Sequence, residues 1–189
     1  HSHSIIRKWF DYAYINLKAA SVLGNLLENI YSDSLLPGEV YKVASDIVDD
    51  IFENKEITLS MGKFKKFFAT AITSKGYISK MTSVIKGYRK LFCVISPVGF
   101  NTTEIMKIIS ENAVHRGYSI EQFYCPMNPE HCIEHVMIPE LNTGVITLNN
   151  YHDLEEWQLG AEVITVDMHD CIDWNSIEKF KNVTTESEK

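Results

Sequence analysis

The sequence predicts an α/β domain, in which a parallel β-sheet is flanked by helices and preceded by a helical hairpin. Two observations support this prediction. In the first quarter of the chain, apolar residues recur every three or four positions, which is the spacing of amphipathic helices. Further along, short apolar runs bounded by turn residues alternate with a helical segment, a pattern typical of parallel strands joined by helical crossovers.

The helical hairpin is expected over residues 5–56. Apolar residues keep helical spacing from Ile6 to Ile30 and again from Val40 to Phe52, and Pro37-Gly38 marks a turn between the two runs. Because the connection is short, the two helices should pack against each other in antiparallel fashion.

The α/β domain is expected over residues 64–175, after a polar linker, and residues 176–189 should form a polar tail. The expected elements are a strand in the aromatic-rich run 64–72, a turn at 74–76, a second strand or the lead-in to a helix over 77–81, a short helix over 81–87, a helix over 104–115 that ends at Gly117, and several strands. The strands are expected at 89–95, 119–125, 144–148 and 162–166. The run 136–141 is apolar but contains Pro139, which predicts an edge strand or an irregular segment.

Composition restricts the class of protein. The chain has 189 residues, of which 45% are hydrophobic and 23% are charged, and such values are ordinary for one globular domain. The net charge of −7 argues against broad nucleic-acid binding, which requires a basic surface. The basic residues between positions 63 and 90 are interpreted as solvent-exposed strand edges and helix ends.

The absence of visible targeting signals and the scattered cysteines predict a cytoplasmic protein. No apolar run reaches the ~18 residues that a membrane span needs, and no secretory signal is visible. The first four residues, His-Ser-His-Ser, look like the remnant of an expression tag. The four cysteines are too scattered for a disulfide scaffold, so a reduced compartment is expected.

The segment between the strand at 89–95 and the helix at 104–115 occupies the position of a phosphate-binding loop. A working loop has the pattern G-x-x-x-x-G-K-[ST], in which backbone N–H groups and a lysine hold the phosphates and a hydroxyl holds magnesium. Here the four matching positions hold Ser96, Asn101, Thr102 and Thr103, so only the final hydroxyl is kept. The candidate nucleotide-binding residues are Ser96, Pro97, Val98, Gly99, Phe100, Asn101, Thr102, Thr103 and Glu104.

Some residues of this loop favour phosphate binding and others oppose it. The helix that begins near Thr102 offers free N–H groups and a positive dipole end to an anion. However, Glu104 places a carboxylate at the mouth, Phe100 fills space that a small residue usually leaves open, and the lysine is replaced by Thr102. The contact that a lysine makes with a phosphate would stabilise binding by about 1.5–3 kcal/mol. Lys107, or a lysine from 75–90, could compensate, so a weak but functional ATP site stays an alternative.

Magnesium would require an acidic residue near the loop. Asp167 follows the apolar run 162–166, which fits the strand-then-aspartate pattern that holds Mg²⁺ beside the hydroxyl of Thr103. ATP and Mg²⁺ are therefore the only cofactors that the sequence suggests.

Several motifs together resemble a family of bacterial ATPase-like proteins with two tandem P-loop domains. They are the segment 67–76 (FFATAITSKG), Arg116-Gly117-Tyr118, 123–126 (FYCP) and Ile138-Pro139-Glu140-Leu141. The resemblance implies that this chain is the second P-loop domain of a longer protein, that the helices before it are the inter-domain region, and that its partner is an intact P-loop domain. His152 matches, by residue type, a histidine that the family carries in its first domain.

The resemblance and the altered loop together predict a degenerate P-loop ATPase-like domain with a structural or regulatory role. Whether it is an enzyme stays open. A further alternative, from a different class, is a metal-binding module built on Cys125 and His135, with His131 and Cys132 nearby. The spacing of these ligands is not one of the regular paired zinc patterns, and no motif indicates a nucleophilic cysteine.

Overall fold

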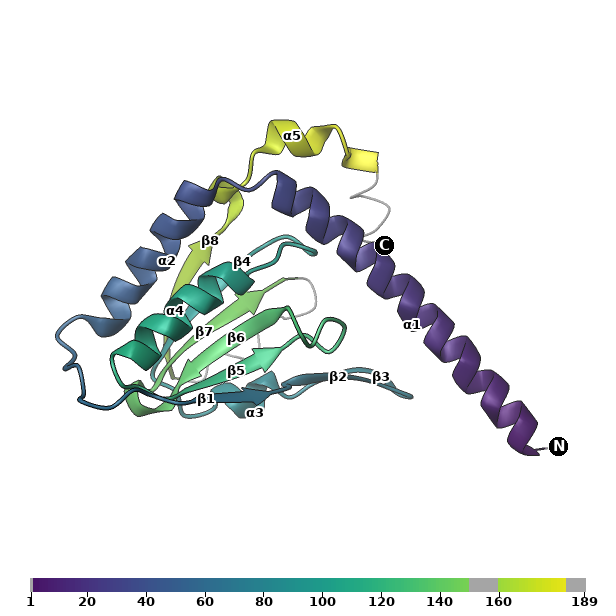
Figure 1. The fold of residues 1–189 in the computed structure, drawn as a ribbon, viewed down its shortest axis with the longest axis horizontal. Helices are drawn as coiled ribbons and strands as arrows, with labels where there is room; N and C mark the ends of the chain where they lie inside the picture. Colours follow the sequence, from purple (N-terminus) through teal and green to yellow (C-terminus); the bar gives the residue numbers. More distant parts are fainter. Residues whose placement is uncertain (1, 150–159, 183–189) are drawn as a thin grey trace.

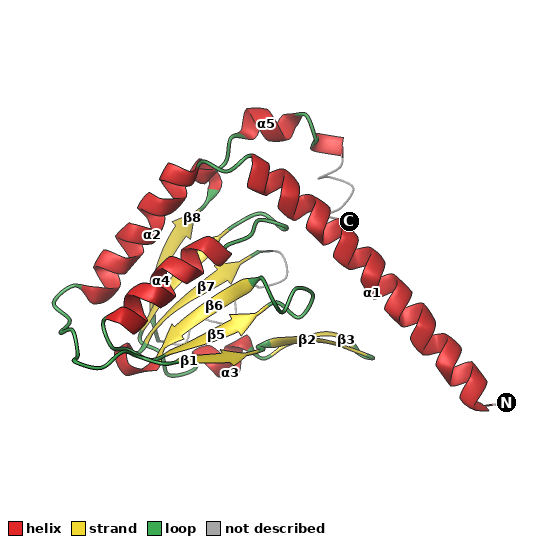
Figure 2. Ribbon diagram, viewed as in Figure 1, coloured by secondary structure: helices red, strands yellow, loops and turns green. Residues whose placement is uncertain are grey.

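A computed structural model describes residues 2–149 and 160–182 of the chain. They form a mixed six-stranded sheet flanked by helices, together with a separate two-stranded hairpin (Figures 1 and 2). The strand order in the sheet is β1-β5-β6-β7-β4-β8. The bounds are β1 Phe64–Phe67, β4 Lys90–Ile95, β5 Ile120–Tyr124, β6 Ile133–Ile138, β7 Thr143–Leu148 and β8 Glu162–Asp167. The predicted α/β class is confirmed.

The sheet is not purely parallel, which corrects one prediction. All strands share one direction except β6, which is antiparallel to both β5 and β7. The connections on either side of β6 are too short for a crossover and permit only antiparallel neighbours. The expectation of an edge or irregular segment at 136–141 is also wrong. β6 lies inside the sheet because Pro139 comes just after its last residue and begins a 3-10 turn, Pro139–Leu141.

The helices lie on both faces of the sheet. α2 (Pro37–Phe52) and α4 (Thr103–His115) cover one face, and the short helix α3 (Met81–Ile85) covers the other. Side chains of β4 alternate between these two cores. Phe92 and Val94 pack toward α2 and α4, whereas Leu91 and Cys93 pack toward α3. β4 is therefore buried on both faces, as its unbroken apolar sequence predicts.

The end of α4 was predicted correctly. The helix ends at His115, and Gly117 adopts a left-handed conformation with φ of 94°. A Cβ atom at this position would lie 1.7 Å from the Oγ1 of Thr58, so the close approach of the linker 54–63 also requires glycine. That linker is fastened to α4 by two backbone hydrogen bonds, one of them from the N–H of Gly62 to the carbonyl of Val114 (2.9 Å).

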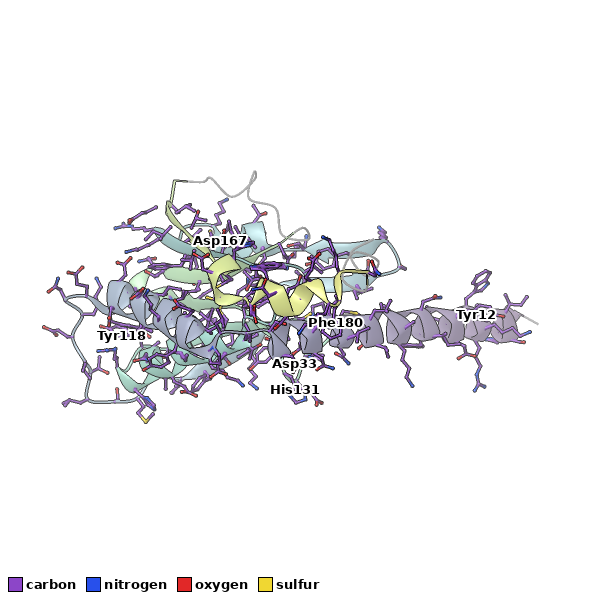
Figure 3. The ribbon with its side chains drawn as sticks, turned by 90° about the horizontal axis from the view of Figure 1, so that it is seen from above. Tyr12, Asp33, Tyr118, His131, Asp167 and Phe180 are labelled. Atoms are coloured by element: carbon purple, nitrogen blue, oxygen red, sulfur yellow. The ribbon has the colours of Figure 1, made fainter. Side chains whose placement is uncertain are left out.

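The predicted antiparallel hairpin at the start of the chain is not formed. α1 (Ser2–Asp33) and α2 are both helical, but they diverge from their connection (Figure 1). The apolar face of α2 packs on α4 and the core, so it is not available to α1. Only the last turns of α1 are buried, through Leu27, Ile30 and Tyr31. Figure 3 shows α1 carrying Tyr12 far from the sheet, opposite the end at which Tyr118 lies.

The remaining elements lie at the edges of the molecule. β2 (Thr70–Thr73) and β3 (Gly76–Ser79) form a hairpin around the predicted turn, and α5 (Trp174–Glu178) follows β8. The apolar run 162–166 is typical of a buried strand, but β8 is an edge strand whose residues are exposed or half-buried. No helix within the described ranges is both long enough and apolar enough to cross a bilayer.

Candidate functional site

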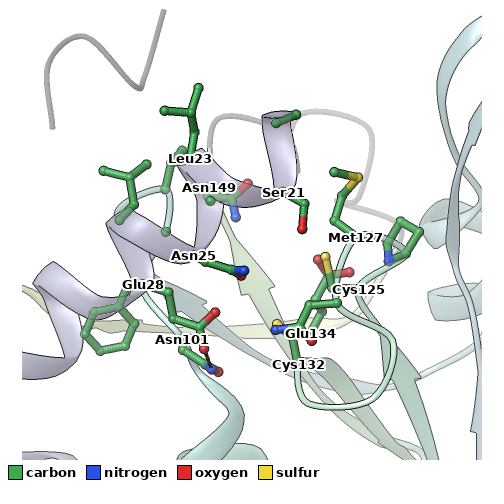
Figure 4. Close-up of a pocket in the computed structure, with 18 of the residues that line it drawn as sticks. Ser21, Leu23, Asn25, Glu28, Asn101, Cys125, Met127, Cys132, Glu134 and Asn149 are labelled. Atoms are coloured by element: carbon green, nitrogen blue, oxygen red, sulfur yellow. Dashed lines mark hydrogen bonds between the residues drawn. The ribbon is translucent and has the colours of Figure 1, made fainter. Parts of the chain in front are cut away.

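The main cavity of the described structure lies where the parallel strands β4 and β7 end. Its volume is about 570 Å³. It is bounded by α1, by the β2–β3 hairpin, by the loop after β4 and by the loop 125–132 between β5 and β6 (Figure 4). The carboxyl ends of parallel strands are the usual place for ligands in α/β proteins, so this cavity is the candidate site.

The loop after β4 lines this cavity, as its position in the sequence predicts. The N–H of Ser96 donates to the carbonyl of Leu148 (3.1 Å), which ties the start of the loop to the end of β7. The N–H of Phe100 donates to the carbonyl of Pro97 (3.1 Å) and closes a tight turn. Gly99 has φ of 86°, and a Cβ atom there would lie 2.5 Å from the Cβ of Leu27 on α1. The helix α1 therefore rests directly on the loop.

Asn101 uses its side chain to connect the loop to two helices. Its Oδ1 accepts a hydrogen bond from the N–H of Thr103 (2.8 Å), the first residue of α4. Its Nδ2 donates to a carboxylate oxygen of Glu28 on α1. The first N–H group of α4 is consequently occupied by a side chain of the loop itself, at the place where a phosphate would bind.

Thr102 occupies the position of the missing lysine and is buried. Its hydroxyl lies 2.8 Å from the hydroxyl of Thr147 on β7. The Thr147 hydroxyl donates in turn to the backbone carbonyl of Glu134 (2.7 Å). Since Thr147 uses its only proton in that contact, Thr102 is the donor of the pair. This chain of hydrogen bonds joins the loop to β7 and β6 and leaves the Thr102 side chain turned into the protein.

Thr103 keeps the hydroxyl that a P-loop uses for magnesium, but the hydroxyl is engaged elsewhere. It accepts a hydrogen bond from the N–H of Ile133 (2.9 Å) and donates to the carbonyl of His131 (3.2 Å). These partners belong to the β5–β6 side of β4. Asp167 ends β8, on the opposite side of β4, and its Oδ1 accepts from the N–H of His169 (2.9 Å). The structure does not bring Thr103 and Asp167 together.

The charges around the cavity are negative. Among the described residues that line it, Glu28 and Glu134 are the ionisable carboxyl groups, and neither lysine nor arginine is present. Glu104 is exposed in the first turn of α4. Lys107 is exposed and does not line the cavity, and Lys90 is bound to Asp50 at 2.6 Å near the start of β4. No cation of the described chain takes the place of the missing lysine.

A second group of polar side chains lies on the other wall of the cavity. Cys125 follows β5, and Cys132 and Glu134 come from the start of β6 (Figure 4). Phe123 pairs with His135 and Tyr124 pairs with Ile133, so Glu134 is the extra residue of a β-bulge. A bulge redirects a side chain and disturbs the ladder. The carbonyl of Glu134 bonds to Thr147, and its side chain lies beside the thiol of Cys125.

The protons of this group are shared unequally. The Cys132 thiol contributes most to lowering the pKa of Cys125, which is about 6. The backbone N–H groups of Met127 and Asn128 and the carboxyl of Glu134 also lower the pKa of Cys125 through hydrogen bonding. Burial, and next the negative charge of Cys125, raise the pKa of Glu134 to about 9. The hydrogen bond to Cys125 also raises the pKa of Cys132 well above its usual value. At pH 7 the group is therefore a Cys125 thiolate held by a neutral thiol and a neutral carboxyl.

The other residues named from the sequence are placed as follows. His135 is fully buried on β6, and its Nδ1 accepts from the N–H of Thr147 (3.1 Å), so it serves the sheet and not Cys125. Among the described residues no set of three or more His, Cys, Asp or Glu side chains is arranged to hold a metal ion. His152 lies outside the described residues.

Comparison of the chain with known protein families, with curated proteins and with solved structures finds no match in any of the three. The site is thus known only from its own residues. Sequence reasoning found the loop and Cys125 but missed Glu134 and the contribution of Glu28. The available signal for Glu134 was a carboxyl residue directly after Ile133 within an apolar strand, where burial is unusual.

Proposed function

We propose that this chain is a degenerate P-loop ATPase-like domain that does not bind a nucleoside triphosphate and acts as a structural or regulatory partner of an intact nucleotide-binding domain. One observation carries the proposal: the side chains of Asn101, Thr102 and Thr103, at three of the four positions that define a working loop, all form hydrogen bonds within the chain. A phosphate would have to displace these contacts before it gained its own.

Electrostatics supports the same conclusion. A triphosphate in the cavity would meet the carboxylate of Glu28, with no lining cation among the described residues, and Glu104 adds a second carboxylate in the first turn of α4, outside the cavity lining. Losing one charge-assisted contact costs about 1.5–3 kcal/mol, which corresponds to about a tenfold to hundredfold loss of affinity. The repulsion from the carboxylates adds to this cost.

The position of α1 is a third, independent obstacle. The Cβ of Leu27 lies close enough to Gly99 that no substituent fits between the two segments. The rings of Tyr31 and Phe100 meet edge to face with their centroids 6.3 Å apart, so the loop and α1 share one packed contact. Restoring the lysine alone would not reopen this space.

The partner role is supported by the exposed part of α1. Its first 26 residues carry ten large apolar side chains that are 42–68% exposed: Ile5, Ile6, Trp9, Phe10, Tyr12, Tyr14, Ile15, Val22, Leu23 and Leu26. Exposed apolar surface of this extent is typical of an interaction surface. Together with the resemblance to proteins that carry two P-loop domains, it favours docking onto an intact nucleotide-binding domain.

Calorimetric titration with Mg-ATP tests the nucleotide half of the proposal. We expect no saturable binding with a Kd below about 1 mM, for the reasons above. Glu104→Lys places a cation at the start of α4, and Glu111→Lys makes the same charge change on the exposed side of the same helix, two turns away. A low-micromolar Kd for the wild-type chain that Glu104→Lys tightens and Glu111→Lys leaves unchanged would show a working site and overturn the proposal.

A further inference from the structure

The cavity wall formed by the loop 125–132 has a chemical use that the proposed function does not include. Cys125 and Cys132 stand at the two ends of this loop, where the N–H of Cys125 donates to the carbonyl of Cys132 (3.0 Å). Their side chains are hydrogen-bonded to each other, both line the cavity and both are only partly buried. Two thiols are thus adjacent and reachable from solvent.

The surroundings of Cys125 stabilise its thiolate. The N–H of Asn128 donates to the carbonyl of Cys125 (3.2 Å), so residues 125–128 form a turn next to this cysteine. Interactions with the Cys132 thiol, with the backbone N–H groups of Met127 and Asn128, and with the Glu134 carboxyl lower the pKa of the Cys125 thiol, that with Cys132 most of all. A low-pKa thiolate next to a second thiol is the arrangement of a redox-active cysteine pair.

The other two cysteines have none of these features. Cys93 and Cys171 are fully buried, and burial raises the pKa of Cys93 to about 11 and that of Cys171 above its usual range. Their burial keeps these two thiols from reacting with disulfides, so they serve as internal controls for the reactivity of Cys125.

We propose that Cys125 and Cys132 form a redox-active dithiol that small-molecule disulfides oxidise, through the cavity, to an intrachain disulfide. In the first step the Cys125 thiolate attacks one sulfur of the disulfide, forms a mixed disulfide and releases one thiolate. In the second step Cys132 loses its proton to that released thiolate, attacks the Sγ of Cys125 and expels the second thiolate, which takes a proton from water. In total two protein thiols are oxidised and one external disulfide is reduced to two thiols.

Ionisation of the neighbouring groups sets the pH range of this reaction. Glu134 faces Cys125 from β6, Cys132 from the end of the loop 125–132 and Tyr77 from the β2–β3 hairpin. Glu28 acts on Cys132 from α1. The pKa of Tyr77 is raised to about 12, chiefly by burial, and Glu134 is neutral up to about pH 9, so neither removes the thiolate near neutral pH. At pH 6 about half of Cys125 is ionised, compared with well under 1% of an ordinary thiol.

The test is to treat the reduced full-length chain with glutathione disulfide and to follow the products by mass spectrometry. We expect Cys125 in the folded chain to react about tenfold faster at pH 6 than the same residue in the urea-unfolded chain, because its larger thiolate fraction outweighs its lower intrinsic nucleophilicity. The final product should lack two hydrogens and contain a 125–132 link. Cys132→Ser should stop at the mixed disulfide on Cys125. Cys125→Ser should abolish the fast reaction at pH 6, because none of the groups around Cys132 lowers the pKa of its thiol.

The matched control is the Cys93→Ser, Cys171→Ser double variant, which should react as the wild-type chain does. Three results would overturn the proposal: glutathione attached first to Cys93 or Cys171, a folded Cys125 no faster at pH 6 than the unfolded one, or a Cys132→Ser variant with the same product as the wild-type chain. Far-UV circular dichroism of each variant distinguishes loss of reactivity from loss of fold. The outcome is independent of Mg-ATP binding, so it separates this inference from the proposed function.

Discussion

Glu134 is the residue whose role depends most on its exact place in the fold. As the extra residue of a bulge, it leaves the ladder of β6 and turns its carboxyl toward Cys125. Its side chain is 17% exposed, and a carboxylate held there would be costly, so the group keeps its proton. The same bulge frees the backbone carbonyl that Thr147 binds. The bulge at Glu134 thus contributes to the cavity wall that contains Cys125 and to the wall that contains Thr147.

The pKa shifts of Glu134 and Cys125 predict a specific pH dependence of stability. Glu134 has a folded pKa of about 9, so above about pH 4.5 the folded state holds a proton that the unfolded state has lost, and stability falls as pH rises. Cys125 has a folded pKa of about 6, so from there to about pH 8.5 its contribution rises with pH. In the wild-type chain the two contributions largely cancel between pH 6 and pH 8.5.

Glu134→Gln should remove only the falling contribution. We expect the free energy of unfolding of this variant to rise relative to that of the wild-type chain from pH 6 to pH 8.5, by at most about 1.4 kcal/mol per pH unit. Urea unfolding at several pH values measures it. Glu130→Gln, at an exposed glutamate of the same loop, is the control and should follow the wild-type curve. Parallel curves for Glu134→Gln and the wild-type chain would mean that Glu134 is ionised in the folded state.

At the scale of elements, the start of α4 shows how the loop after β4 keeps its shape by contacts within the chain. The first N–H groups of a helix require acceptors, and an anion is one solution. Here the Oδ1 of Asn101 provides the acceptor, and its Nδ2 ties the cap to Glu28 of α1. The loop is therefore stable without a bound anion.

Asn101 variants should separate these two contacts. Asn101→Ala removes both and should cost about 1–2 kcal/mol of unfolding free energy, as for other helix caps. Asn101→Asp keeps the acceptor but sets a carboxylate against Glu28, so it should be less stable at pH 7 than at pH 4 relative to the wild-type chain. Adding Glu28→Gln should restore most of the loss at pH 7. A pH-independent cost of Asn101→Asp, unchanged by Glu28→Gln, would contradict this account; chemical denaturation provides the measurement.

At the scale of the whole molecule, α1 divides into two functional parts. Its later turns close the cavity through Leu27 and Glu28 and pack on the core through Ile30 and Tyr31, whereas the part before Leu17 extends away from the sheet (Figure 1). A single continuous helix is a stiff connection between these parts. Binding of a partner to the exposed part would therefore be transmitted to the segment of α1 that lines the cavity and contacts Gly99.

Truncation should show that the two parts are independent in stability. Deleting residues 1–14 should change the free energy of unfolding by less than about 0.5 kcal/mol, since the side chains of residues 3–14 are exposed. Leu27→Ala, in contrast, should cost about 2–5 kcal/mol because Leu27 is buried against the loop. Thermal and urea unfolding both report these values. A large loss on deletion would indicate that the exposed part already packs on the same or another chain.

Much of the secondary structure could be predicted, because it depends on local patterns. The apolar spacing located α1, α2 and α4, and Gly76 and Gly117 marked turns that the structure keeps. Pro37-Gly38, which was predicted as a turn, instead begins α2, and the break between the helices lies just before Pro37. The direction of β6 was missed because Pro139 was read as an interruption, although it stands one residue beyond the strand. For the candidate site, the loop residues and Cys125 could be found from the sequence, whereas Glu134 and Glu28 could not.

The sequence by itself determined most of the helices and strands, that the loop after β4 has no lysine, and that the net charge is acidic. Only the tertiary structure decided that α1 lies on Gly99 and not on α2, that Asn101 caps α4, and that Cys125, Cys132 and Glu134 share one wall. The physical reason is the range of the forces involved. Backbone propensity and apolar periodicity act over a few residues, whereas the bulge, the cap and the cavity arise from contacts between segments that are far apart along the chain.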